Sequence, residues 1–245
     1  MSGEIAISVK NLNKSFKVDK GELKALKNIN LEIKKGEFFT IVGPSGAGKS
    51  TLLRIISGLD KEFSGKVSWN NLTKDDFSFV FQQFALMPWL TVYENVEFSL
   101  LSKNLSESEK KSRISRELKK LGLDKFADSY PGELSGGMKQ RVGIARALVT
   151  NPKVIFMDEP LSELDSFTSK ELRKEILNIW KERKTTIIMV THNIDDAIEM
   201  ADRIAVLSLS PGRIIKLISN SLSRPRDLRS PKFFKFEDEI YRLIK

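Results

Sequence analysis

The chain of 245 residues contains no cysteine and only one histidine, His192. The absence of cysteine excludes disulfides, thiolate zinc sites and a thiol nucleophile, and a single histidine excludes any site built from several imidazoles. Long hydrophobic runs are also missing: the most apolar run, near residues 187–190, has the length of a strand, whereas a membrane-spanning helix needs about 20 apolar residues. The N-terminus does not combine a basic region with a long apolar stretch, as a signal peptide does. We therefore expect a chain that by itself neither spans a membrane nor is secreted.

Acidic residues are in deficit, with 32 Asp and Glu against 41 Lys and Arg, so the formal net charge is +9. Such an excess suits an anionic partner: a nucleotide, a nucleic acid or an anionic membrane surface. A lysine-rich, solvated surface explains the same charge, because net charge reports on solubility and association rather than on fold. The hydrophobic fraction of 40% and the length fit one large globular domain, or one domain with an insertion.

Hydrophobic periodicity divides the chain into a strand-rich first third, a helical middle and an alternating last part. In the middle, residues 92–149, Ser106 and Glu109 form a capping-box pattern ahead of a helix with apolar Ile114 and Leu118. Alternation of strands and helices after residue 150 indicates a mostly parallel sheet with helices on its faces. The end of the chain, from residue 221, is basic, rich in proline and arginine, and weakly helical at 236–244. Predicted strands lie at residues 5–9, 31–33, 38–42, 67–69, 77–81, 154–157, 187–190 and 204–207.

Residues 43–50 read GPSGAGKS and match the phosphate-loop pattern G-x-x-x-x-G-K-[ST]. The loop follows an apolar strand and precedes a helix, so backbone amides and the positive end of the helix dipole can hold phosphates there. Lys49 is expected to reach the β- and γ-phosphates, and the Ser50 hydroxyl to bind Mg²⁺. A plain glycine turn is the alternative, which the strand–loop–helix context disfavours. The predicted ATP-binding residues of this loop are Gly43, Pro44, Ser45, Gly46, Ala47, Gly48, Lys49, Ser50 and Thr51.

Two further strand ends carry polar side chains. An apolar strand ends in Asp158 and Glu159, which places Asp158 to face a metal ion and Glu159 to orient or deprotonate an attacking water. The alternative is that Asp158 caps a turn before Pro160. His192 ends another apolar strand. A lone histidine is often a surface residue or a satisfied core residue, and the position of His192 at a strand end is also typical of a functional residue.

Residues 134–141 read LSGGMKQR and open a helix. Ser135 is a suitable N-cap, and the glycines expose backbone amides, so this segment is a second anion site at a helix N-terminus. Together with the phosphate loop before it and the acidic strand after it, the segment resembles the signature motif of ABC ATPases, and the resemblance covers about residues 5–215. Further matches to the family are Gln82 for the Q-loop, Asp165 for the D-loop, His192 for the switch histidine and Phe16 for the aromatic residue stacked on adenine.

The resemblance implies an α/β P-loop NTPase fold: a RecA-like, mostly parallel sheet, an antiparallel β-subdomain and an inserted helical subdomain at about residues 88–150. The ATPase domain would comprise residues 4–220, followed by a basic tail at 221–245. Glu159, His192, Lys49 and Gln82 would be catalytic, and Ser50, Gln82 and Asp158 would bind Mg²⁺. In a head-to-tail dimer, formed by two copies or with a paired ABC ATPase, ATP would be contacted from the other subunit by Ser135, Gly136, Gly137 and Met138.

Two segments narrow the resemblance to one branch of the ABC ATPase family. They are LMPWLTV at residues 86–92 and VLSLSPGR at 206–213, which are similar to segments in the ATPases of nitrate, sulfonate and taurine importers. The resemblance then implies a peripheral protein on the cytoplasmic face of the membrane. It would drive separate integral permease subunits and serve an extracytoplasmic solute-binding protein indirectly. A nucleic-acid-associated ABC protein is the main alternative, supported by the charge of +9 but not by any heptad run, zinc cysteines or second phosphate loop. A P-loop kinase or GTPase is the third, without an Asn-Lys-x-Asp stretch.

Overall fold

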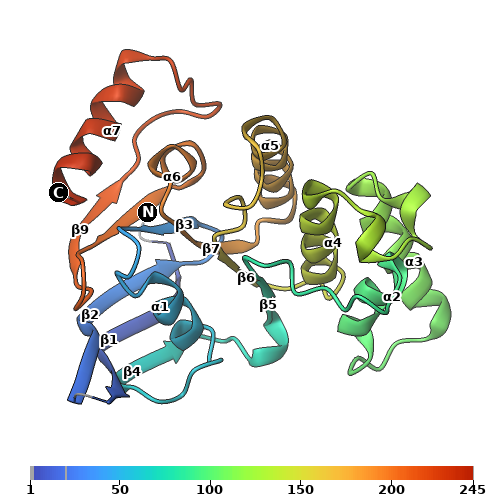
Figure 1. Ribbon diagram of the computed structural model, residues 1–245, viewed down its shortest axis with the longest axis horizontal. Helices are drawn as coiled ribbons and strands as arrows, with labels where there is room; N and C mark the ends of the chain where they lie inside the picture. The colour runs from blue at the N-terminus through green and yellow to red at the C-terminus, as the bar shows by residue number, and fades with distance from the viewer. Residues whose placement is uncertain (1–2, 20, 245) are drawn as a thin grey trace. The chain divides into compact units, whose positions relative to one another are not determined.

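The computed structural model describes residues 3–19 and 21–244, which form two compact units (Figure 1). The first unit combines the two ends of the chain, up to Lys74 and from Trp180 onward. The second unit is Asp75–Ile179.

The first unit contains a three-stranded antiparallel sheet in the order β2-β1-β4. Its strands are β1 (Ile5–Val18), β2 (Gly21–Lys34) and β4 (Ser64–Trp69). Inward-facing residues alternate along β1 and β2, and Ile7 lies opposite Ile33 while Val9 lies opposite Leu31, all of them buried. Both long strands extend well beyond the predicted ranges 5–9 and 31–33, because their outer halves form a polar hairpin in which hydrophobic alternation is weak.

The first unit also contains four strands in the order β7-β3-β8-β9. The strands β3 (Phe38–Val42), β7 (Thr186–Thr191) and β8 (Arg203–Leu207) run parallel, and the edge strand β9 (Ile214–Ser219) is antiparallel to β8. Every residue of β3 and β7 is buried, as expected for parallel strands covered on both faces. The sequence analysis missed β9, because an edge strand with exposed Ile215 and Leu217 shows no clean alternation.

Three helices of the first unit pack beside these strands: α1 (Lys49–Ile56), α6 (Ile194–Met200) and α7 (Pro231–Ile244). Figure 1 shows α7, at the red end of the chain, beside α6, and Phe233 and Ile240 are the residues that α7 buries. The helix therefore starts five residues before the range predicted at 236–244. Ser230 explains the earlier start, because its hydroxyl accepts a hydrogen bond from the amide of Phe233 at 3.3 Å.

The second unit pairs β5 (Phe77–Val80) with β6 (Val154–Asp158) in parallel. Its helices are α2 (Val92–Glu97), α3 (Glu107–Lys120), α4 (Gly136–Leu148) and the part of α5 (Ser166–Arg183) up to Ile179. The capping box predicted for Ser106 and Glu109 is confirmed at the start of α3. Short 3-10 turns connect these elements, at Lys74–Asp76, Phe98–Leu100, Asp124–Phe126 and Pro131–Glu133. Within the described residues, none of the helices combines the length and apolar character needed to cross a membrane.

Candidate functional site

The phosphate loop lies between the buried strand β3 and helix α1, as predicted from its sequence. Gly46 and Gly48 have φ values of 80° and 86°, the left-handed region that favours glycine, and Gly48 is the N-cap of α1. A Cβ atom on Gly43 would lie 2.8 Å from the carbonyl oxygen of Leu207, and one on Gly48 would lie 2.9 Å from Cδ2 of Leu26. Glycine is thus favoured at Gly46 by backbone conformation, at Gly43 by the close approach of neighbouring chain, and at Gly48 by both.

Lys49 folds over this loop and is only 5% exposed. Its Nζ donates hydrogen bonds to the carbonyl oxygens of Gly43 and Pro44, both at 3.1 Å. A buried ammonium group beside a left-handed glycine turn and a helix N-terminus forms a cationic cradle, the environment that a phosphate anion requires. The residues present therefore fit a nucleotide with its phosphates in the loop.

His192 follows β7 directly, and the preceding residue, Thr191, is paired with Val42 at the end of β3. His192 and the phosphate loop consequently lie at the same edge of this parallel sheet, where β7 and β3 end. The Oγ1 atom of Thr191 accepts a hydrogen bond from the amide of Asn193 at 3.0 Å, and Asn193 caps α6. The histidine side chain itself is exposed.

Phe16, the residue matched to adenine stacking, lies on β1 with 40% of its surface exposed. The Nζ of Lys14 lies 4.9 Å from the centre of its ring, and Lys14 forms an ion pair with Asp60 at 2.8 Å. Burial acts to raise the pKa of Asp60, but the hydrogen bond and charge of Lys14, with the amide of Glu62, outweigh it and lower the pKa. The Lys14–Asp60 pair thus fixes a cation against Phe16, a cation–π contact that orients the ring.

In the second unit, Gln82 and Asp158 extend from the same edge of a parallel strand pair. Val80 is paired with Met157, Gln82 lies two residues after Val80, and Asp158 lies one residue after Met157. Asp158 is 3% exposed and ends β6. Glu159 has a φ of 44°, unusual for a side chain of this size, and its carbonyl oxygen accepts a hydrogen bond from Oγ of Ser162 at 3.0 Å.

The signature segment begins helix α4. The prediction of Ser135 as N-cap is confirmed, since its Oγ accepts a hydrogen bond from the amide of Met138 at 3.3 Å. A Cβ atom on Gly137 would collide with Cγ2 of Thr168 in α5, so glycine permits the close approach of these two helices. The helix starts at Gly136, directly after its cap, although glycine is a poor helix former.

Asp165, matched to the D-loop, caps helix α5. Its Oδ1 accepts hydrogen bonds from the amides of Phe167 at 2.9 Å and Thr168 at 3.0 Å. Hydrogen bonds from the side chain and the backbone of Thr168 lower the pKa of Asp165, so it is ionised at neutral pH. Aspartate is one of the residue types favoured at a helix N-cap, which is the sequence signal for this cap.

Arg146 of α4 is a residue that the sequence analysis missed. It is 9% exposed and donates to the carbonyl oxygens of Ala85 at 2.6 Å and Phe84 at 3.1 Å, in the segment that follows Gln82. Burial lowers the pKa of Arg146. A charged residue within the apolar run of residues 144–149 is a sequence signal that could have indicated it.

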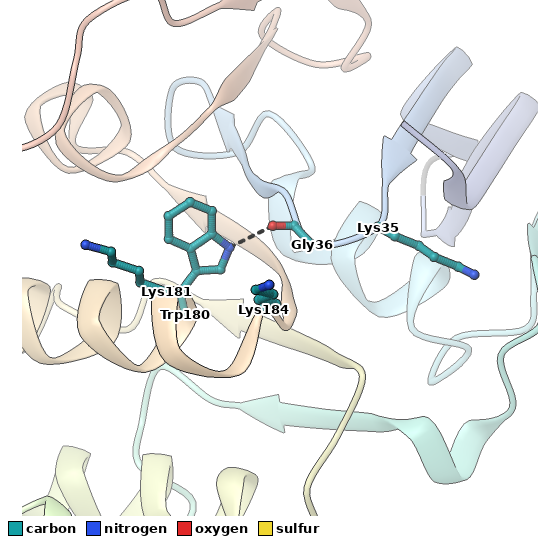
Figure 2. A pocket seen from close by; sticks show the side chains of 5 residues that line it. All are labelled: Lys35, Gly36, Trp180, Lys181 and Lys184. Atoms are coloured by element: carbon teal, nitrogen blue, oxygen red, sulfur yellow. Dashed lines mark hydrogen bonds between the residues drawn. The ribbon is translucent and has the colours of Figure 1, made fainter. Parts of the chain in front are cut away.

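A separate pocket of about 410 Å³ lies at the opposite edge of the parallel strands of the first unit (Figure 2). Gly36 precedes β3 and Lys184 precedes β7, whereas the phosphate loop follows β3. Trp180 lines the pocket and its Nε1 donates to the carbonyl oxygen of Gly36 at 3.0 Å. The remaining lining residues are Lys35 and Lys181.

The strand–phosphate loop–helix arrangement and the parallel strands define an α/β P-loop nucleoside triphosphatase. The family model described as ABC transporter matches residues 26–162. The chain belongs to the ABC transporter family, as its ATP-binding ATPase component.

Relatives of known name cover nearly the whole chain. The aliphatic sulfonates import ATP-binding protein of Bacillus thuringiensis subsp. konkukian is 43% identical over 240 residues, 96% of this chain and 94% of that protein. The nitrate import ATP-binding protein of Synechocystis sp. is 41% identical over 252 residues, 98% of this chain and 95% of that protein.

A solved structure confirms the fold class. The dimeric post-hydrolysis state of an ATP-binding cassette bound to ADP and Pi has a TM-score of 0.77 and 39% identity, and the match covers 90% of this chain and 99% of that one. The α/β P-loop fold and the ATPase assignment are thus confirmed. The nucleic-acid-associated alternative finds no support among these relatives.

Proposed function

We propose that the chain is the ATP-hydrolysing subunit of an importer for a small anion such as a sulfonate, taurine or nitrate. The observation that supports this solute class is likeness along 96% and 98% of the chain to the sulfonate and nitrate import ATP-binding proteins. A separate integral membrane permease carries the solute in this scheme, and an extracytoplasmic solute-binding protein acts through that permease.

The cradle around Lys49 supports the assignment of nucleotide binding. The backbone amides of residues 45–51 and the ammonium of Lys49 bind the phosphates, and Phe16 stacks on the adenine, with Lys14 on its ring. The Ser50 hydroxyl, the Gln82 amide oxygen and the Asp158 carboxylate are assigned to Mg²⁺, because hard oxygen atoms are the donors that this ion prefers. Bound Mg²⁺ supplies charge neutralisation on the phosphates during transfer.

Four side chains share the remaining catalytic work. Glu159 accepts a proton from the attacking water, and the hydrogen bond from Ser162 to its carbonyl oxygen holds its main chain in the turn after β6. His192 and Gln82 orient the water and the transferred phosphoryl group, and Lys49 stabilises the charge that develops on the leaving oxygens.

Dimerisation places the second anion site on the nucleotide of the other subunit. The amides at the start of α4 follow the Ser135 cap and carry the positive end of a helix dipole. We assign Ser135, Gly136, Gly137 and Met138 to the γ-phosphate bound by the partner, and Asp165 to the region between the two subunits. ATP then joins the two copies, and hydrolysis releases them.

Contact with the permease is assigned to the loop that precedes α2. Trp89 in this loop is 72% exposed. Asn95 is fully buried, and its Nδ2 donates to the carbonyl oxygens of Met87 at 3.1 Å and Leu90 at 2.9 Å. These hydrogen bonds hold the backbone of the loop against α2. A rigid loop with an exposed tryptophan, next to Pro88, has the composition of a protein interface. The subunit is accordingly a peripheral protein on the cytoplasmic face of the membrane.

The test is purification of tagged Glu159→Gln protein with ATP from detergent-solubilised native membranes, followed by mass spectrometry. Because the carboxylate that accepts the proton is replaced, the variant should remain ATP-bound and retain its permease. We expect one multi-span membrane protein in near-stoichiometric amount, and wild-type protein with ADP serves as the matched control. The solute is then identified by testing sulfonates, taurine and nitrate for stimulation of ATPase activity in vesicles that contain the permease and its binding protein.

Recovery of nuclease-resistant and salt-resistant ribonucleoprotein in place of a membrane protein would contradict the importer assignment. An unchanged hydrolysis rate in Glu159→Gln would contradict only the role of Glu159.

A further inference from the structure

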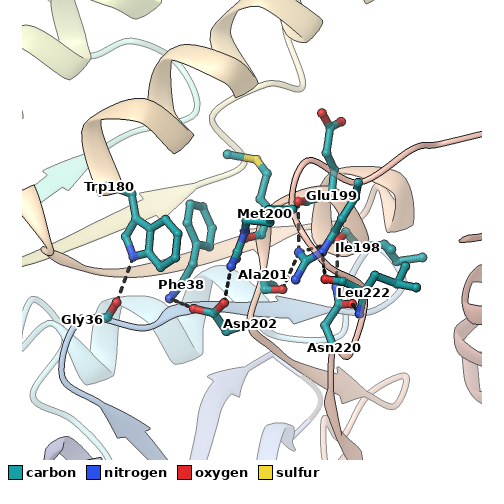
Figure 3. A network of polar contacts seen from close by, with 12 residues as sticks. Gly36, Phe38, Trp180, Ile198, Glu199, Met200, Ala201, Asp202, Asn220 and Leu222 are labelled. Carbon is teal, nitrogen blue, oxygen red and sulfur yellow. Dashed lines mark hydrogen bonds and ion pairs between the residues drawn. The ribbon is translucent and has the colours of Figure 1, made fainter. Parts of the chain in front are cut away.

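The C-terminal segment binds the end of the helix that follows His192. The helix α6 spans Ile194–Met200, and Ala201 is its C-cap. The carbonyl groups of residues 198–201 therefore accept no hydrogen bond from within the helix. Each of these four carbonyl oxygens accepts a hydrogen bond from a side chain of residues 220–226 (Figure 3). Five hydrogen bonds from one short segment thus satisfy four consecutive carbonyl groups at the helix end.

Arg226 makes most of these contacts. Its Nη1 donates to the carbonyl oxygens of Ile198 at 2.8 Å, Glu199 at 3.0 Å and Ala201 at 2.7 Å. Its Nε donates to the carbonyl oxygen of Leu222 at 3.0 Å, which fixes the segment's own backbone. The side chain is 8% exposed, and burial together with the charge of Arg224 lowers its pKa to about 10, so it remains charged at neutral pH.

Two other side chains of the segment complete the arrangement. Asn220 donates through Nδ2 to the carbonyl oxygen of Ile198 at 2.8 Å, and Arg224 donates through Nη2 to that of Met200 at 2.5 Å. Arg224 also forms an ion pair with Asp202 at 2.5 Å. Asp202 in turn accepts a hydrogen bond from the amide of Phe38, so the contacts link α6 to the first residue of β3.

The opposite end of α6 lies directly after His192. Asn193 is the N-cap, and its Oδ1 accepts a hydrogen bond from the amide of Asp196 at 3.2 Å. A helix of seven residues is about 10 Å long and moves as a rigid body, so a shift of its C-terminus displaces its cap and the adjoining histidine. A positive charge at the C-terminus of a helix is also favourable in itself, because it opposes the negative end of the dipole.

We propose that Arg226 is a positioning residue for His192: the segment of residues 220–226 fixes the end of α6 and thereby the place of the histidine beside the phosphate loop. The proposal rests on the proposed function in that His192 acts on the nucleotide. It gives the C-terminal segment, which lies outside the phosphate-binding and signature motifs, a defined part in the ATPase cycle. Any partner that displaced this segment would lower the hydrolysis rate without touching the nucleotide.

The test uses Arg226→Met, which keeps the aliphatic stem and removes every donor. Arg229→Met is the matched control, because Arg229 lies three residues after Arg226, outside the segment of residues 220–226, and its side chain is exposed. We expect Arg226→Met to reduce kcat for ATP hydrolysis about tenfold with KM for ATP changed less than about twofold, as for a displaced catalytic group. Arg226→Lys, which keeps the charge but not the branched donor geometry, should recover part of kcat.

A second readout does not depend on hydrolysis. His192 is the only histidine, so its imidazole signals in the NMR spectrum of the nucleotide-free protein need no assignment by mutation. These signals should shift and broaden in Arg226→Met and stay unchanged in Arg229→Met. If Arg226→Met fails to fold, Asn220→Ala removes one donor to Ile198 and should shift the same signals by a smaller amount.

Unchanged imidazole signals in folded Arg226→Met or Asn220→Ala would overturn the proposal. So would a loss of kcat that Arg229→Met reproduces. Absence of ATPase activity in the wild-type protein, with the imidazole shift still present, would contradict the proposed function and leave the positioning contact established.

Discussion

The guanidinium of Arg146 in α4 donates to the carbonyl oxygen of Ala85 at 2.6 Å, across 61 residues of sequence. Ala85 and the preceding Phe84 have φ values of 49° and 52°, a left-handed conformation that costs free energy in residues other than glycine. The contact therefore holds a strained turn in place. Because Ser135 caps α4 and the turn follows Gln82, the side chain of Arg146 connects the signature helix to the Q-loop segment.

Arg146→Met should release this turn. The substitution removes a buried, charged donor and leaves two carbonyl groups without it, so we expect the free energy of unfolding to fall by about 1–3 kcal/mol. Urea denaturation measures this change, and limited chymotrypsin digestion should show faster cleavage near Phe84. Lys174→Met, at an exposed position of α5, is the control for loss of a charge. Equal cleavage rates in both variants would show that the turn does not depend on Arg146.

Gly137→Ala should destabilise the second unit, because the added Cβ atom collides with Cγ2 of Thr168. Thr168→Ser removes that methyl group but keeps the hydroxyl that bonds Asp165. The double variant Gly137→Ala/Thr168→Ser should recover at least half of the decrease in melting temperature that Gly137→Ala causes. Thr168→Ser alone should change the melting temperature little. Calorimetry of the four proteins forms a double-mutant cycle. Strictly additive effects would mean that the collision is relieved elsewhere.

Lys49→Ala should weaken ATP binding by about 10- to 100-fold, as expected for the loss of one charge-assisted hydrogen bond to phosphate. The fold should survive, since Lys49 donates hydrogen bonds to two carbonyl groups of its own loop and losing these is a local change. Titration calorimetry with ATP measures the affinity, and Lys61→Ala, at an exposed position, is the control. An ATP affinity in Lys49→Ala equal to that of wild type would contradict the assignment of the phosphate loop to the nucleotide site.

Asp60 makes part of the stability of the first unit dependent on pH. The pKa of Asp60 is lowered in the folded state. Its contribution to the free energy of unfolding is therefore present above the pKa of the unfolded state, about 4, and is lost as the pH falls through the pKa of the folded state. Asp60→Asn should therefore lower the melting temperature at pH 7 and converge with wild type as the pH falls below about 4. Glu62→Gln is the control, because Glu62 lies 4.0 Å from the same lysine but is 95% exposed. A difference from wild type that does not shrink as the pH falls below about 4 would mean that the effect is not ionic.

Local sequence was sufficient wherever a motif and its structure lie within one stretch of chain. The phosphate loop and the caps at Ser106 and Ser135 are of this kind, because each depends on hydrogen bonds within a few residues. The parallel strands were predictable too, since burial on both faces produces continuous apolar runs such as that of β7. The edge strand β9 was not, because exposed Ile215 and Leu217 break its alternation. The first turns of α7 were also missed: they bury Phe233 but directly follow a segment rich in proline and arginine.

The sequence by itself determined the class of this protein, its nucleotide-binding loop and the family to which it belongs, because these depend on short segments with fixed spacing. Only the tertiary structure revealed what holds those segments: Arg146 against the carbonyl groups of Phe84 and Ala85, and Arg226 against the end of α6. Both arginines bind backbone oxygen atoms that are at least 25 residues away in sequence. Every residue type carries such an oxygen, so no pattern of side chains along the chain identifies which carbonyl group an arginine will reach; the folded backbone alone decides it.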